Sequence, residues 1–306
     1  MNEADSFVQY RVTHITTYDY TEPVSLCQNV AHLAPRAVAG QTCLETSLAI
    51  APWPTVLVEQ IDYFGNPATF FAVQEPHRQL TLTALHHVEV GPRAAPDSSK
   101  TPAWETVRDR LRADRSPEVL AAAEFVFDSR YVNVATEFLD YARASFGDGR
   151  PLLEAALDLT SRIHANFEYD PRSTTVATAL AEVFANRHGV CQDFAHLQIA
   201  CLRSLGLSAR YVSGYLSTEP PPGCVPLVGS DATHAWLSIF CPGAGWIDLD
   251  PTNDQITGEG HILLAWGRDY DDVSPVKGVV LGGGQHAVNV AVNVERLSEQ
   301  EPLGIA

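Results

Sequence analysis

The hydrophobic pattern of the chain changes across a segment rich in Pro, Ser and Gly at residues 91–104. Before it, apolar and polar residues alternate, as in FVQYRVTHITTYDY and LTLTALHHVEV, which is typical of strands with one buried face. After it, apolar residues recur at three- and four-residue spacing, as in amphipathic helices. The pattern predicts an all-β, sandwich-like domain over residues 1–92, a linker with helices over 93–150, and an α+β unit over 151–306.

The clearest helix lies in GVCQDFAHLQIACLRSLG, where the apolar residues from Phe194 to Leu205 form one stripe and Gly206 ends the pattern. It is predicted to run from about Cys191 to Leu205. Three strand-like segments follow, ARYVSGYL, THAWLSIF and GWIDLD, the last two joined by the turn CPGAG. The later segment KGVVLGGGQHAVNVAVNV is predicted to form a closing hairpin with a glycine turn.

Cys191 stands where a thiol is easily activated, because a helix N-terminus favours the thiolate and Gly189 lets the backbone approach closely. A nucleophilic cysteine needs a base, and the base needs an orienting partner. His234 starts one predicted strand and Asp250 ends the next, so pairing of the two strands would bring them together. We expect Asp250 to hold Nδ1–H of His234 while Nε2 faces the thiol.

These three blocks resemble the core of the transglutaminase-like cysteine-enzyme superfamily: GVCQDFAHLQIACLRSLGLSARYVSGYL, then DATHAWLSIF and GWIDLDPTN, in the family's order. The segments YRVTHITTYDYTEPVSLCQNVAHLAPR and DYFGNPATFF resemble the β-domain of bacterial transglutaminase-like proteins, and HILLAWGRDYDDVSPVKGVVLGGGQH resembles their C-terminal segment. The resemblance covers most of the chain and is weakest in the linker and the first helices.

The resemblance implies a papain-like α+β catalytic core with Cys191 as nucleophile, His234 as general base and then acid, and Asp250 as orienting carboxylate. The implied reaction is acyl transfer at an amide through a thioester, without a cofactor or metal. The family's oxyanion donor does not transfer onto one matching position, and Gln192 and Tyr169 are the candidates.

Several functions stay open at this level. Hydrolysis by a peptidase or amidase is favoured because water needs no second binding site, and transamidation of glutamine uses the same thioester. A non-catalytic binding protein on the same fold, and acyl transfer from a small thioester or to a small amine, are the rivals. The expected partner is a polypeptide or another amide-containing substrate, and the oligomeric state is open, a homo-oligomer included.

Other residues admit simpler roles. Asp250 precedes Pro251 and can be a turn residue, in which case Asp248 is the alternative carboxylate. His188 and His196 flank Cys191 without a recognised metal-ligand spacing, so we expect local polar contacts. Asp193 is expected in the first helical turn, pointing away from the thiol. The acidic loop with Asp269, Asp271 and Asp272 is expected to be structural rather than calcium-binding. The tryptophans Trp236, Trp246 and Trp266 are expected to belong to the core or the cleft wall rather than to a ligand cage.

Composition excludes some classes of function. The formal net charge of −17 argues against a nucleic-acid partner, since phosphate binding needs clustered basic residues. No segment has the apolar length of a membrane span, and no leader precedes the first strand, which predicts a cytoplasmic protein away from the membrane. The six cysteines form no CxxC pair, so neither a zinc site nor a disulfide framework is expected. The Pro-rich loop TEPPPGCVPLVGSD is expected to border the cleft.

Overall fold

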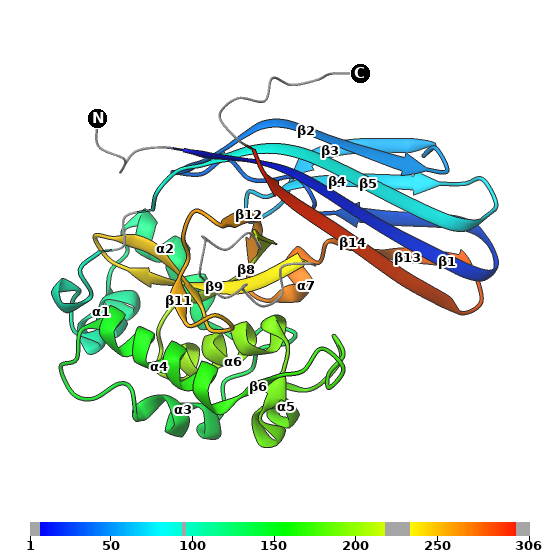
Figure 1. Ribbon diagram of the computed structural model, residues 1–306. Helices are drawn as coiled ribbons and strands as arrows, with labels where there is room; N and C mark the ends of the chain where they lie inside the picture. Colours follow the sequence, from blue (N-terminus) through cyan, green and yellow to red (C-terminus); the bar gives the residue numbers. More distant parts are fainter. Residues whose placement is uncertain (1–6, 94–95, 218–232, 298–306) are drawn as a thin grey trace.

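The computed structural model describes residues 7–93, 96–217 and 233–297. Within them the chain forms a β-sandwich and, beside it, a sheet covered by helices (Figure 1). The predicted fold class, an α+β core preceded by an all-β sandwich, is confirmed. The Pro-rich loop predicted at the cleft border lies outside the described residues.

The sandwich is organised around β1 (Val8–Ala31), a 24-residue strand whose pairing register shifts between Asp19 and Val24. Its first half lies between β5 (His77–Val90) and β14 (His286–Arg296). Its second half lies between β4 (Pro67–Val73) and β13 (Val276–Gly282). β2 (Gln41–Ala51) extends the first layer beside β5, and β3 (Val56–Ile61) extends the second beside β4. One bent strand therefore belongs to both layers.

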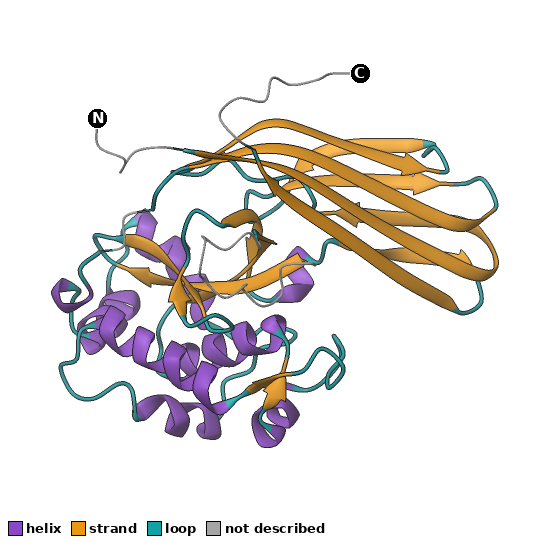
Figure 2. Cartoon of the chain, in the orientation of Figure 1, coloured by secondary structure: helices purple, strands orange, loops and turns teal. Residues whose placement is uncertain are grey.

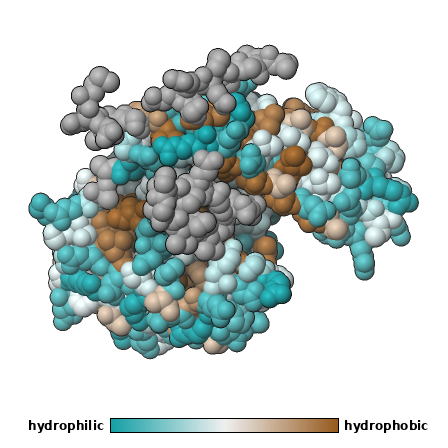
Figure 3. Space-filling view, in the orientation of Figure 1, coloured by the Kyte–Doolittle hydropathy of each residue, from teal (hydrophilic) through white to brown (hydrophobic). Residues whose placement is uncertain are grey.

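The two layers face each other across an apolar core (Figure 2). Leu80 and Leu82 of β5 pack in one cluster with Cys27, Phe71 and Val73 from the other layer, and all five are at most 1% exposed. The alternation of the sequence produces this arrangement, because every second residue of a strand points inward. Apolar side chains also gather on the outer surface of the sandwich (Figure 3), including exposed valines of β13 and β14.

The C-terminal strands differ from the prediction, which placed them in the core as a hairpin. β13 and β14 do not pair with each other; both run antiparallel to β1, with Val276 opposite Ala31 and Arg296 opposite Tyr10. Gly283 and Gly284, both at positive φ, turn the chain opposite the bend of β1. Because glycines at positive φ suit a bend as well as a hairpin turn, the pattern could not name the partner strand. Residues 276–296 thus lie in the sandwich, within the range expected for the core.

The core sheet has the strand order β11-β10-β9-β8-β12 and is antiparallel. The predicted strands appear as β8 (Ala209–Leu216), β9 (Thr233–Cys241) and β10 (Gly245–Asp250), with a turn between the last two. β11 (Gln255–Ile256) and β12 (His261–Gly267) complete the sheet at its two edges.

Helices cover the face of this sheet that lies away from the sandwich (Figure 1). The predicted central helix is α6 (Cys191–Ser204), which packs on β8 and β9. Pro151 immediately precedes α4, where a fixed backbone φ suits the start of a helix. The remaining helices are α1 (Trp104–Ala113), α2 (Pro117–Ala123), α3 (Thr136–Arg143), α4 (Leu152–Asn166), α5 (Leu180–Asn186) and α7 (Tyr270–Val273).

Two short strands, β6 (Glu168–Tyr169) and β7 (His188–Gly189), pair in parallel just before α6. They fix the path of the chain into the helix that begins with Cys191. No helix among the described residues has the length and apolar content to cross a bilayer.

Candidate active site

Cys191 is the first residue of α6, and the turn that precedes it is tightly built. The carboxylate of Asp193 folds back and accepts hydrogen bonds from the backbone N–H of Val190 at 2.9 Å and from the hydroxyl of Thr174 at 2.6 Å. A Cβ on Gly189 would lie 2.8 Å from Oδ2 of Asp193, so only glycine leaves room for this cap. Gly189 is therefore needed for the cap at the N-terminus of α6. Asp193 makes this cap by bonding to the backbone of Val190, the residue before Cys191.

His234 and Asp250 meet as the sequence predicts. Pairing of β9 with β10 places Leu237 opposite Leu249, which brings the start of one strand near the end of the next. Nε2 of His234 lies 2.8 Å from Oδ2 of Asp250, and both side chains have no exposed surface. The predicted ring orientation is wrong, because Nε2 and not Nδ1 bonds the carboxylate. Spacing along two strands brings residues together but does not set which edge of an imidazole turns toward which partner.

The other ring nitrogen of His234, Nδ1, is not used in the hydrogen bond to Asp250. Nδ1 is buried and makes no hydrogen bond of ordinary length and angle among the described residues, although Cys191 is near enough to act on the ring as a hydrogen-bonding partner. Burial alone would lower the pKa of His234, but the Asp250 carboxylate and then the nearby Cys191 outweigh it and raise the pKa to about 10. The thiol at the start of α6 and this imidazole are therefore within electrostatic reach of each other.

Asp250 is held by more groups than the sequence suggested. Its Oδ1 accepts the backbone N–H groups of Thr252 at 2.9 Å and Asn253 at 3.2 Å. Its Oδ2 accepts the side-chain amide of Asn253 at 2.8 Å and Nε2–H of His261 at 3.1 Å, besides His234. Burial would raise the pKa of Asp250, but the imidazoles of His234 and then His261 hold it far below its usual value. The carboxylate is thus kept ionised inside the protein.

His261, at the start of β12, was missed by the sequence analysis. The backbone N–H of Gly258 donates to its Nδ1 at 3.2 Å, so the proton of the neutral ring sits on Nε2 and points at Asp250. No motif marks this histidine, because its closeness to Asp250 depends on β12 joining the far edge of the sheet. His234, Asp250 and His261 have ligand atoms within 4.8 Å of one another, the arrangement of a metal site. Since Nε2 of His261 already donates to the carboxylate, the three residues fit a hydrogen-bonded cluster better than a set of metal ligands.

Two tyrosines are near enough to the thiol to interact with it electrostatically. Tyr169 of β6, one of the two predicted oxyanion candidates, has its pKa raised to about 12 by burial and then by Cys191. Tyr211 of β8, which the sequence analysis did not single out, is fully buried, and burial followed by Cys191 raises its pKa as well. Gln192, the other candidate, is the second residue of α6 and half-buried. Tyr169 is therefore the predicted candidate that the structure connects electrostatically to Cys191.

Asp248, the alternative carboxylate, makes no hydrogen bond with His234 among the described residues and instead bonds to other side chains of the core sheet and the linker. It accepts hydrogen bonds from Nε1 of Trp236 at 3.3 Å and from the hydroxyl of Ser238, and Arg93 approaches it at 3.5 Å. It lines a separate pocket with Trp246 and Trp266, and neither His234 nor Asp250 is among the residues there.

His196 and the acidic loop make structural contacts, whereas no side-chain hydrogen bond is seen for His188 among the described residues. Nε2 of His196 accepts the backbone N–H of Tyr270 at 3.1 Å, whereas Nδ1 of His188 is buried without a partner among the described residues. The remaining contacts are those of the acidic loop: Asp269 caps α7, Asp271 pairs with Arg130 and Lys277, and Asp272 pairs with Arg268.

Two family models match the chain. The bacterial transglutaminase-like N-terminal region matches residues 10–89, and the transglutaminase-like superfamily matches residues 140–251, which includes Cys191, His234 and Asp250. A protein from Cytophaga hutchinsonii, described as a candidate cysteine protease, has the same fold with a TM-score of 0.75 and 22% identity, over 97% of this chain and 93% of that one.

Related sequences extend over nearly the whole chain. An uncharacterised protein of Mycobacterium tuberculosis is 42% identical over 294 residues, covering 94% of this chain and 92% of its own. An uncharacterised protein of Mycobacterium leprae is 33% identical, covering 94% of this chain and 99% of its own. A protein-glutamine gamma-glutamyltransferase of Pseudomonas aeruginosa is 29% identical over 119 residues, 39% of this chain and 18% of that protein. With both domains matched in order and the site residues inside the matched core, the chain belongs to the transglutaminase-like superfamily, in the form that carries the bacterial N-terminal region.

Proposed function

We propose that the protein is a cysteine-dependent enzyme that transfers the acyl group of an amide through a thioester on Cys191, with water as the favoured acceptor. One observation carries the proposal: His234 bonds Asp250 at 2.8 Å through Nε2, while its buried Nδ1 makes no hydrogen bond of ordinary length and angle among the described residues and Cys191 is close by. In this arrangement Asp250 orients the imidazole, and its second nitrogen can exchange a proton with the thiol of Cys191.

In the first half of the reaction, Nδ1 of His234 takes the thiol proton and the sulfur of Cys191 attacks the amide carbonyl. The carbonyl oxygen then carries the negative charge, and the backbone N–H of Cys191 at the helix start is suited to bind it. The C–N bond breaks as His234 returns the proton to the leaving amine. The product is a thioester between Cys191 and the acyl group.

In the second half, water enters and His234 removes its proton, so that hydroxide attacks the thioester. The C–S bond breaks, a carboxylic acid leaves, and the proton returns to the sulfur. Throughout, the ionised Asp250 stabilises the imidazolium form of His234 and fixes its ring. The hydrogen bonds that Asp250 accepts from Thr252, Asn253 and His261 keep this charge in place.

Transamidation is the second candidate, and the Pseudomonas aeruginosa relative favours it because that protein is named a protein-glutamine gamma-glutamyltransferase. The chemistry differs only in the acceptor, since a primary amine replaces water at the thioester. The same residues would serve both reactions. The substrate of the proposed enzyme is a polypeptide or another molecule with an accessible amide.

Mass spectrometry separates these reactions. The purified full chain is incubated with a peptide library in water enriched in ¹⁸O, with and without cadaverine, and the Cys191→Ala variant serves as the control. Cleaved or deamidated peptides that carry ¹⁸O identify a hydrolase, and cadaverine adducts at glutamine identify a transglutaminase. Neither product should appear with Cys191→Ala.

Thiol labelling tests the enzyme proposal against a binding protein on the same fold. Iodoacetamide should alkylate Cys191 faster than the thiol of a short unstructured peptide at pH 7, and His234→Ala should remove the difference. If Cys191 reacts no faster than the peptide thiol and no peptide product forms, the catalytic proposal fails.

A further inference from the structure

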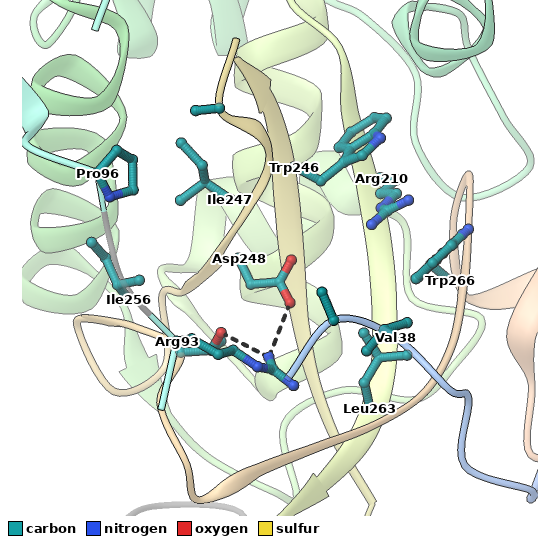
Figure 4. A pocket seen from close by; sticks show the side chains of 13 residues that line it. Val38, Arg93, Pro96, Arg210, Trp246, Ile247, Asp248, Ile256, Leu263 and Trp266 are labelled. Atoms are coloured by element: carbon teal, nitrogen blue, oxygen red, sulfur yellow. Dashed lines mark hydrogen bonds and ion pairs between the residues drawn. The ribbon is translucent and has the colours of Figure 1, made fainter. Parts of the chain in front are cut away.

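A pocket lies between the sandwich and the core sheet (Figure 4), with a volume of about 260 Å³. The loop after β1 contributes Val38 and Ala39, the linker contributes Arg93, and β8 contributes Arg210. The ring of Tyr211, the next residue, packs 4.9 Å from that of His196 on α6, so Arg210 points to the opposite face of the sheet. None of the three proposed catalytic residues lines this pocket.

Arg210 is held between two tryptophans. Its guanidinium carbon lies 4.2 Å from the ring centre of Trp246 and 3.7 Å from that of Trp266 (Figure 4). Arg36 covers Trp266 at 3.4 Å, which extends the stack into the sandwich. Because indole rings lie close to the Arg210 guanidinium on two sides, its N–H groups can bind partners only where the rings leave them accessible.

The guanidinium of Arg210 donates fewer hydrogen bonds than it has N–H groups. Nε of Arg210 donates to the hydroxyl of Ser238 at 3.3 Å, and the two terminal nitrogens have no hydrogen-bond partner among the described residues. Arg210 as a whole residue is only 7% exposed. Burial lowers the pKa of Arg210 to about 9, and the opposing effect of Asp248 does not compensate for it. The two terminal nitrogens are not among the fully buried unpartnered atoms, so an anion or water in the pocket can reach them.

The charges around the pocket leave an excess of positive charge. Asp248 is already bonded to Trp236 and Ser238, and Arg93 reaches it at 3.5 Å. The other contacts of Arg93 are also long, at 3.4 Å, and its Nε is buried without a partner among the described residues. Two guanidinium groups therefore face one carboxylate, which suits a ligand with a single negative charge.

We propose that this pocket binds a small organic carboxylate about the size of one amino acid. The planar carboxylate would accept two parallel hydrogen bonds from the terminal N–H groups of Arg210, the geometry that arginine offers to carboxylates. The rest of the ligand would lie against the apolar walls formed by Val38, Ile247, Ile256 and Leu263. A site of this kind combines mostly apolar walls with a few placed polar groups.

The test measures binding rather than turnover. The full chain with Cys191→Ala, which should not consume the probe and leaves the pocket intact, is titrated with N-acetylalanine by calorimetry and by tryptophan fluorescence. N-acetylalanine amide has nearly the same shape without the charge, and inorganic phosphate supplies an anion of another geometry. We expect saturable binding of N-acetylalanine with a Kd of about 1 mM or tighter, and at least about tenfold weaker binding of the amide and of phosphate.

Rim variants locate the site without disturbing the stack. Ala39 is exposed and lines the pocket, so Ala39→Glu should weaken binding of N-acetylalanine at least about tenfold by placing a like charge there. Ala37 is also exposed but does not line the pocket, so Ala37→Glu should bind as the parent does. The proposal is overturned if N-acetylalanine does not bind, if the amide or phosphate binds as tightly, or if the two glutamate variants bind equally well.

Discussion

Replacing Asp250 by Asn changes one oxygen of a fully buried carboxylate into an NH₂ group and removes its charge. In the native protein this carboxylate accepts hydrogen bonds from two backbone N–H groups, two imidazoles and one side-chain amide. An asparagine has a single oxygen, so its NH₂ group must face at least two of these donors. Each buried donor left without an acceptor costs about 1–3 kcal/mol.

Both orientations of the new amide impair the site. If NH₂ replaces Oδ1, it faces the backbone N–H groups of Thr252 and Asn253, and His234 keeps its orientation beside a neutral partner. If NH₂ replaces Oδ2, it donates to Nε2 of His234 and drives the proton onto Nδ1, where it blocks acceptance of the thiol proton. We expect the free energy of unfolding to fall by about 2–5 kcal/mol and kcat to fall by about 10³- to 10⁴-fold, as for a catalytic imidazole in the wrong tautomer.

The assay compares urea unfolding with kcat of the folded fraction, using a peptide substrate found by mass spectrometry. Asp248→Asn is the matched control, because it makes the same chemical change two residues earlier on β10, away from His234. That variant should lose stability but keep kcat within about tenfold of the parent. If Asp250→Asn also stays within tenfold, or if Asp248→Asn loses as much, the role assigned to Asp250 is wrong.

Three further predictions concern the helix start, the second imidazole and the response to acid. Gly189→Ala should destabilise the fold by about 1–3 kcal/mol, measured by urea unfolding, because the new Cβ would lie 2.8 Å from Oδ2 of Asp193, whereas Gly258→Ala, with open space at its Cβ, should not. His261→Phe should remove one of the five hydrogen bonds to Asp250, cost about 1–2 kcal/mol, and lower kcat less than Asp250→Asn does; a kcat loss as large as that of Asp250→Asn would contradict a positioning role. His14 and His86 have their pKa values lowered from 6.5 to about 4 by burial, so their contribution to stability is complete above pH 6.5 and is lost as the pH falls through about 4, at up to about 1.4 kcal/mol per pH unit each. Urea unfolding should give a lower free energy of unfolding at pH 4.5 than at pH 7. Replacing both histidines by Gln should make this difference smaller. If the difference is the same in the parent and in the double variant, the assignment to His14 and His86 is wrong.

The sequence predicted local structure well where local chemistry decides it. The strand β8 has the predicted bounds, and the start of α6 at Cys191 follows from the residues around it. The meeting of His234 with Asp250 was also predictable, because a short turn leaves two adjacent strands little choice of partner.

Features that depend on distant partners were not predictable. His261 reaches Asp250 through the edge of the sheet opposite to β10 and β11, and no spacing along the chain encodes that closeness. The stack of Arg36, Trp266 and Arg210 joins residues of the sandwich to residues of the core. The alternation of β13 and β14 indicates strands but does not say beside which strand they lie.

The position of β13 and β14 has a consequence for the order in which the protein can be built. β1 has neighbours on both sides only when residues 276–296 are present, and these follow its last residue by about 245 positions. During translation at about 5–20 residues per second, one side of this long strand would wait roughly 10 to 50 seconds for its partner. An unpaired strand edge can pair with the strands of other chains. Until synthesis ends, the free edge of β1 should therefore need protection by chaperones, unless its pairing with other chains is slower than synthesis.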